Sequence, residues 1–227
     1  MGAKIESSGT RISVSPLTAA LLALDINIPG DISSAAYWLV AGAIHPSAKL
    51  KIVNCGVNPT RTGILDALLN MGAKLRIENQ REEGNEPIAD LCIESSQLHG
   101  IEISKEMIPR IIEDIPALAV AACVAEGETV IRNAGELRVK ESDRISTIVR
   151  ELSRMGAKIE ELPDGMVIHG SSRLVGNEVE SHADHRLAMS LAIASLITKG
   201  NSVIQNAHAA DVSYPGFWEQ LGKISNY

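Results

Sequence analysis

The stretch Met71-Gly72-Ala73-Lys74-Leu75-Arg76 occurs three times in this chain in nearly the same form. The other copies are Met1-Gly2-Ala3-Lys4-Ile5-Glu6, 70 residues earlier, and Met155-Gly156-Ala157-Lys158-Ile159-Glu160, 84 residues later. These spacings are too long for a short-repeat solenoid, whose units have roughly 20–50 residues. The repeat therefore indicates a domain that is built from a few large and similar units.

Each of the two later copies lies at the end of an amphipathic helical pattern, over residues 62–71 and 142–155, and leads into a strand-like stretch. The glycine fits the C-terminus of a helix, where a left-handed residue ends the helix without a side-chain penalty. Three apolar, alanine-rich segments follow the same period, at residues 33–44, 115–125 and 184–197. They are hydrophobic on nearly all sides, which is typical of helices buried in the centre of a domain.

Each apolar segment precedes a strand-like stretch, at residues 49–53, 128–131 and 201–204. The unit is therefore a buried helix, a strand, an amphipathic helix and paired strands, which places the chain in the α/β or α+β class. Three units, about 30–100, 101–176 and 177–227, are expected to form one domain with pseudo-threefold symmetry and buried helices covered by mixed sheets. Because Met1 coincides with the end of a unit, we expect a chain cut from something longer, with residues 1–29 as the tail of an upstream domain and residues 30–227 as a C-terminal one.

Bulk composition narrows the function classes. The 227 residues carry a formal net charge of −7, which argues against a nucleic-acid partner but leaves room for a local cluster of cations. Cys55, Cys92 and Cys123 show no metal-type spacing and are expected to be reduced thiols of a cytoplasmic protein. There is no signal-peptide pattern, and the longest apolar run is too short for a membrane span.

Two charged motifs are candidates for a site. The first is Arg138-Val139-Lys140-Glu141-Ser142-Asp143-Arg144, which we interpret as one helical turn with Lys140 and Arg144 on the same side and Glu141 beside them. Two such cations can hold a phosphate or carboxylate, and the carboxylate can move a proton. The alternative for this motif alone is a salt-bridged helix surface.

The second motif is Asp184-His185-Arg186. Asp184 is predicted to cap the apolar helix that follows it, with His185 and Arg186 in the first turn, where backbone N–H groups and the helix dipole favour an anion. A metal site around His182 and His185 is not favoured, because no third ligand lies at motif spacing. The segment Asn58-Pro59-Thr60-Arg61 is interpreted as a turn and helix entry.

Taken together, these motifs resemble the C-terminal half of the 3-phosphoshikimate 1-carboxyvinyltransferase (5-enolpyruvylshikimate-3-phosphate synthase) family. The matching segments run in the family's order and cover almost the whole chain: residues 30–37 (GDISSAAY), 115–119 (IPALA), 137–144 (LRVKESDR), 184–189 (DHRLAM) and 213–217 (SYPGF). The resemblance implies two domains, each of three βαβαββ units, of which this chain supplies most of one. It also implies that residues 58–61 face away from the chemistry and are structural.

The resemblance also implies an activity of the shikimate pathway, in aromatic amino acid biosynthesis. The family transfers the enolpyruvyl group of phosphoenolpyruvate to the 5-hydroxyl of shikimate 3-phosphate and releases phosphate, with no cofactor and no metal. Lys140 would contact the substrates, Glu141 would be the acid/base at C3, Arg144 and Arg186 would bind phosphoenolpyruvate, and His185 would stabilise charge. The N-terminal half is the expected partner, and this chain alone is expected to be inactive.

The carboxylate that activates the hydroxyl is left open. Many bacterial relatives have Asp-Glu before the Ile-Pro of the second buried helix, whereas this chain has Glu113-Asp114. Strict register favours Glu113, and a small backbone shift would let Asp114 serve. Two further departures carry no role over: Glu136 stands where some relatives have a substrate-binding Asn, and Asp211 and Val212 stand where some have a Lys.

Two rival functions stay open at this point. One is a UDP-N-acetylglucosamine enolpyruvyl transferase relative, against which the Asp-His-Arg motif and the lack of a reactive-cysteine loop argue. The other is a non-catalytic binding module that has lost its partner domain. The presence of all five residues of the resemblance at Lys140, Glu141, Arg144, His185 and Arg186 speaks against such a loss of function.

Overall fold

The computed structural model describes residues 1–225 of the chain. Three helices form its centre: α1 (Ile32–Ile44), α4 (Ile115–Val124) and α6 (His185–Ser195). Each of the three contacts both of the others. These are the apolar segments that the sequence predicted, and nearly all their residues are buried. Alanine is frequent in all three, and its small side chain lets neighbouring helix backbones approach closely.

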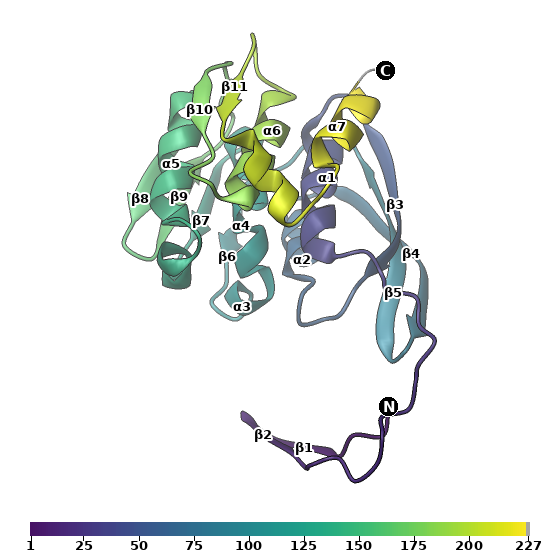
Figure 1. Cartoon of the computed structure of the whole chain (residues 1–227). Helices are drawn as coiled ribbons and strands as arrows, with labels where there is room; N and C mark the ends of the chain where they lie inside the picture. The colour runs from purple at the N-terminus through teal and green to yellow at the C-terminus, as the bar shows by residue number, and fades with distance from the viewer. Residues whose placement is uncertain (226–227) are drawn as a thin grey trace.

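Sheets cover the helices on the outside (Figure 1). One is antiparallel, with the order β3 (Lys49–Gly56), β5 (Glu86–Glu94) and β4 (Lys74–Glu83). A second is mixed, with the order β6 (Glu102–Ile103), β7 (Glu128–Ile131), β9 (Gly165–His169) and β8 (Lys158–Leu162). A third pairs β10 (Glu178–Glu180) with β11 (Val203–Gln205) in parallel. The expected α/β class, with central helices under mixed sheets, is confirmed.

Each unit also has its second helix, namely α2 (Gly63–Asn70), α5 (Arg144–Arg154) and α7 (Phe217–Ser225). The remaining short helices are α3 (Ile108–Ile111), η1 (Ile112–Asp114), η2 (Gly135–Val139) and η3 (Ala207–Val212). Gly72 and Gly156 follow α2 and α5 with φ of 87° and 91°, so the expected left-handed ends of these two helices are confirmed. The repeated motif thus marks where an amphipathic helix ends and an outer strand begins.

The interpretation of residues 138–144 as one helical turn is wrong. The 3₁₀ helix η2 ends at Val139, Lys140 is extended, and α5 begins only at Arg144, after the N-cap Asp143. Asp143 accepts a hydrogen bond from the backbone N–H of Ser146, which stabilises that helix start. Lys140 and Arg144 therefore converge through tertiary structure and not through helical spacing.

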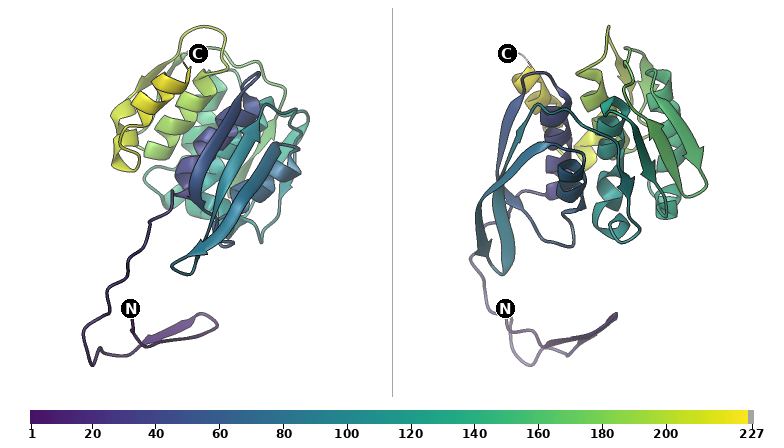
Figure 2. Two further views of the ribbon diagram at one scale, coloured as in Figure 1. Left: turned by 90° about the vertical axis from the view of Figure 1, so that its right-hand side faces the viewer. Right: turned by 180° about the vertical axis from the view of Figure 1, so that it is seen from behind.

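Residues 1–29 form an arm that leaves the rest of the molecule (Figures 1 and 2). It carries a small hairpin of β1 (Ile5–Ser8) and β2 (Arg11–Val14), whose residues are all exposed. The arm joins the central region at Gly30, whose N–H donates to the Asn54 carbonyl and whose own carbonyl accepts from Gly56. Within residues 1–225, no helix has both the length and the apolar character that crossing a bilayer would require.

Candidate active site

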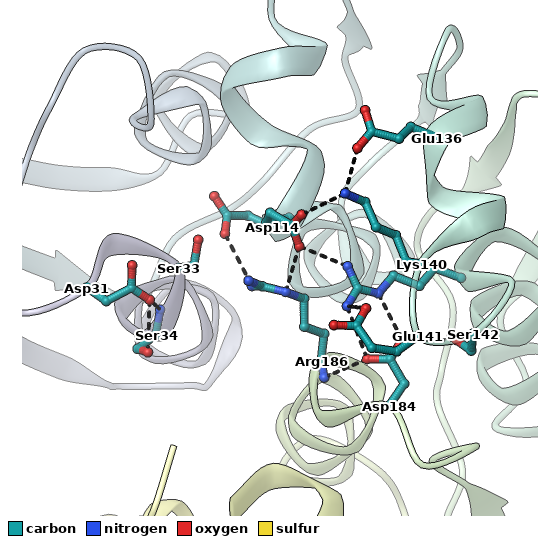
Figure 3. Close-up of polar contacts among 12 residues, drawn as sticks. Asp31, Ser33, Ser34, Asp114, Glu136, Lys140, Glu141, Ser142, Asp184 and Arg186 are labelled. Atoms are coloured by element: carbon teal, nitrogen blue, oxygen red, sulfur yellow. Dashed lines mark hydrogen bonds and ion pairs between the residues drawn. The ribbon is translucent and has the colours of Figure 1, made fainter. Parts of the chain in front are cut away.

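The N-terminal ends of the three central helices meet at one place (Figure 3). Asp31 and Asp184 cap α1 and α6, and their side chains accept from the N–H groups of Ser34 and Arg186. Asp114 stands directly before α4, with Arg186 Nη1 3.9 Å from its Oδ1. Helix N-termini carry partial positive charge and unpaired N–H groups, so three together favour anionic groups.

Glu113 is the centre of the charged cluster. Its carboxylate lies 3.0 Å from Lys140 Nζ, 2.9 Å from Arg144 Nη1 and 2.9 Å from Arg186 Nε. Partial burial raises the pKa of Glu113, but the hydrogen bond from Lys140 and the charge of Arg186 outweigh it and hold the pKa at about 2. Glu113 is therefore ionised at neutral pH and forms ion pairs with three cations at once.

Arg144 is a buried cation, with 1% of its side chain exposed. Its Nε donates to Asp184 Oδ2 at 2.8 Å, and its Nη2 donates to Glu141 Oε2 at 2.6 Å. Asp184 is fully buried and also accepts from the Ser142 hydroxyl at 3.0 Å. A buried charge is tolerated only when it is paired in this way, so the guanidinium of Arg144 is held in one position.

Asp114 is the second carboxylate of the Glu113-Asp114 pair, and it points into the molecule. It is 2% exposed, and burial raises its pKa to about 6, against the lowering effect of a hydrogen bond from Ser33. Beside it lies the buried hydroxyl of Tyr37, which has no hydrogen-bond partner within residues 1–225. Burial also raises the pKa of Tyr37 well above its usual range. Asp114 is thus shielded from solvent, whereas Glu113 remains partly accessible.

Lys140 and His185 complete the set of candidates. Lys140 Nζ lies 2.6 Å from Glu136 Oε1, and its hydrogen bonds to Glu136 and Glu113 raise its pKa, so it stays protonated. Burial, together with the positive charge of Arg186, lowers the pKa of His185, so its imidazole is neutral at pH 7. The structure therefore brings Glu113, Lys140, Glu141, Arg144 and Arg186 into one ion-paired cluster. His185 adjoins it on α6 and takes no part in its ion pairs within residues 1–225.

Three features of the site were not predicted from the sequence. Asp184 was predicted only as a helix cap, yet it is also the buried partner of Arg144. Ser33 and Asp31 reach the site from α1, which the helix-start pattern Asp-x-x-Ser at residues 31–34 would have indicated. The loop at residues 58–61 does not face away: Arg61 Nη2 donates to Ser33 Oγ at 3.2 Å.

Two side chains around the possible metal site, His182 and Asp184, each pair with another residue instead of with one another. His182 Nε2 lies 2.9 Å from Glu151 Oε1, while Asp184 pairs with Arg144. Across residues 1–225, no group of three or more His, Cys, Asp or Glu side chains is arranged to hold a metal ion. The cluster itself offers three cations that can bind anions and several carboxylates that can accept protons.

Comparison with known proteins shows the family of the chain. Residues 1–221 match the family model of EPSP synthase (3-phosphoshikimate 1-carboxyvinyltransferase). Curated proteins named 3-phosphoshikimate 1-carboxyvinyltransferase are 55% identical in Gloeobacter violaceus, over 98% of this chain and 51% of that protein, and 50% identical in Bacillus cereus, over 99% and 52%. The chain thus spans about half the length of these relatives.

Solved structures of related proteins have the same fold as this chain. EPSP synthase from Acinetobacter baumannii superposes with a TM-score of 0.93 at 40% identity, over 98% of this chain and 52% of that one. The enolpyruvyl transferase NikO from Streptomyces tendae shares the fold, with a TM-score of 0.75 at 21% identity, over 98% and 50%. Family model, relatives and structure thus converge on one conclusion: the chain belongs to the EPSP synthase family.

Proposed function

We propose that this chain supplies one half of the active site of an enzyme that transfers the enolpyruvyl group of phosphoenolpyruvate to the 5-hydroxyl of shikimate 3-phosphate, with release of phosphate. The observation that carries the proposal is Glu113, whose carboxylate is surrounded by Lys140, Arg144 and Arg186. A cluster of this kind answers the main demand of the reaction, which is to hold anionic groups beside a proton acceptor.

Arg144 and Arg186 bind phosphoenolpyruvate in this proposal. Guanidinium groups match carboxylates and phosphates in bidentate fashion, and Arg144 is already held in position by Asp184. In the free chain, the Glu113 carboxylate occupies the N–H groups that an incoming anion would take. Substrate binding therefore frees Glu113 from its cations, and its pKa rises toward the ordinary value.

Glu113 is then the carboxylate that accepts the proton of the attacking hydroxyl. It is partly accessible and touches the cations that position the substrates, whereas Asp114 is buried behind it. Strict register supports the same choice. Lys140 contacts both substrates, Glu141 exchanges the proton at C3, and neutral His185 donates a hydrogen bond to charge that develops nearby. No step calls for a metal or an organic cofactor.

The missing part of the site is proposed to come from the N-terminal half of the enzyme. Residues 1–29 belong with that half, and residues 30–227 form the C-terminal domain, of which residues 226–227 lie outside the described structure. The exposed apolar side chains of the arm, among them Ile5, Ile12 and Val14, support this division, because each is more than half exposed within residues 1–225.

The test is phosphate release from phosphoenolpyruvate plus shikimate 3-phosphate, measured with the chain alone and with a separately expressed N-terminal half. We expect turnover only in the mixture. Turnover by the chain alone would refute the two-half arrangement. If the two halves associate but the mixture releases no phosphate, a non-catalytic binding module would be favoured. In the active mixture, Glu113→Gln is expected to lose more than about 100-fold in kcat, and Asp114→Asn much less. The reverse order would assign the proton transfer to Asp114.

A further inference from the structure

The turn that leads into α6 has an unusual backbone. His182 and Ala183, two consecutive residues that are not glycine, have φ of 53° and 57°. The left-handed region is unfavourable for L-residues, and two in succession persist only where the surrounding structure holds them. Such strain points to a position whose geometry matters and which neighbouring side chains hold in place.

Glu151 holds it from α5. Its side chain is 1% exposed, although it lies on a helix whose other face is in solvent. Oε1 lies 2.9 Å from His182 Nε2, and Oε2 accepts the backbone N–H of Glu180 at 3.1 Å. Arg150 and Arg154 of the same helix complete the pairing of the buried carboxylate. One carboxylate thus bonds both the start of the turn and its first left-handed residue.

The turn in turn sets the position of Asp184. The Asp184 N–H donates to the Ser181 carbonyl, which closes the turn, and its side chain reaches Arg144 at 2.8 Å and the Arg186 N–H at 2.9 Å. Ser181 is itself fixed, since its hydroxyl donates to the Asn206 carbonyl. A displacement of this turn therefore moves the Asp184 carboxylate. That carboxylate orients Arg144, and it also caps α6, the helix that carries Arg186.

We propose that Glu151 is a positioning residue for the active site, which acts through the strained His182-Ala183 turn on Asp184 and so on both arginines. It touches none of the residues of the Glu113 cluster. This inference rests on the proposed function only for its kinetic consequence. Its structural content, that Glu151 holds the turn, is independent of what the site binds.

The test uses the full-length enzyme, or the two associated halves, with Glu151→Gln. Glutamine keeps the shape but removes the negative charge that pairs with Arg150 and Arg154, and it leaves one oxygen where the carboxylate has two for Glu180 N–H and His182. Since a misplacement of about 1 Å in a binding group can lower activity about 100-fold, we expect the KM for phosphoenolpyruvate to rise about 10-fold or more, with kcat changed less than about threefold. Glu160→Gln is the matched control, since Glu160 is exposed on β8 and bonds only to His169 among described residues.

Rescue separates positioning from general destabilisation. Ala183 is exposed, so Ala183→Gly removes the backbone strain at residue 183, one of the two left-handed residues, without removing buried packing. In the Glu151→Gln background, Ala183→Gly should lower the raised KM for phosphoenolpyruvate by about threefold or more. Amide hydrogen exchange at residues 181–186 gives a readout that needs no activity, and we expect it to be faster in Glu151→Gln and nearly normal in the double variant.

Unchanged exchange at residues 181–186 in Glu151→Gln would overturn the inference, whatever the kinetics. So would a fall in kcat that follows the folded fraction, with an unchanged KM and no rescue by glycine. If the unsubstituted enzyme does not turn over these substrates, the proposed function fails, and the exchange experiment still decides whether Glu151 holds the turn.

Discussion

Asp114→Asn should make the protein more stable at neutral pH, although it alters a residue beside the proposed catalytic carboxylate. The Asp114 side chain is 2% exposed, and burial raises its pKa from 3.8 to about 6. Well below pH 4 it is protonated in both the folded and the unfolded chain. Between pH 4 and 6 the folded state retains a proton that the unfolded state releases, so the free energy of unfolding falls as pH rises.

The size of the effect follows from the same two values. The pKa difference is about 2, and each pH unit corresponds to about 1.4 kcal/mol, so ionised Asp114 lowers stability by about 3 kcal/mol above pH 6. Asparagine has nearly the same shape, can still accept from Ser33, and does not ionise. We expect it to gain roughly 1–3 kcal/mol at pH 8 and close to nothing at pH 4.

Urea unfolding of the chain and of Asp114→Asn, at intervals from pH 4 to 8, measures the difference directly. Asp211→Asn, at an exposed position of η3, provides the baseline for an aspartate-to-asparagine change on the surface. A stability difference between Asp114→Asn and the parent that is constant across this range would refute the reasoning. A loss at pH 8 would show that the ionised carboxylate is stabilised by Arg186 more than burial opposes it.

Three further changes test the packing and the charges that support the site. Arg144→Met leaves Asp184 buried without its partner and should destabilise by about 3–5 kcal/mol in urea unfolding; a loss under about 1 kcal/mol would mean that another cation replaces the guanidinium. Leu118→Ala opens a cavity among the central helices and should destabilise by about 3–5 kcal/mol, whereas Leu69→Ala, 43% exposed on α2, should change stability by less than about 1 kcal/mol. Equal effects of the two leucine changes would contradict the assignment of the core. Gly165→Ala places a Cβ against a β7 carbonyl oxygen and should destabilise by about 1–3 kcal/mol, seen as a lower Tm; an unchanged Tm would show that β9 can shift.

The local sequence pattern was enough to predict the main elements of the architecture. The three copies of the Met-Gly-Ala-Lys motif, the alanine-rich segments and the helix caps predicted where central helices, outer strands and left-handed glycines would lie. These features depend on residues close together in sequence, through side-chain periodicity and through backbone hydrogen bonds within one turn. The interpretation of residues 138–144 as a helical turn failed because Asp143 caps α5 and so starts the helix later.

The sequence by itself determined the fold class, the family resemblance and the set of charged residues from which a site could be built. Only the tertiary structure decided which carboxylate of the Glu113-Asp114 pair meets the cations and which is buried beside Tyr37. It also decided that Arg144 is buried against Asp184 and that a strained turn held by Glu151 sets that contact. The reason is that burial and ion pairing depend on residues far apart in the chain, such as Arg144 and Asp184 or Tyr37 and Asp114, whose approach is set by helix packing and not by spacing along the chain.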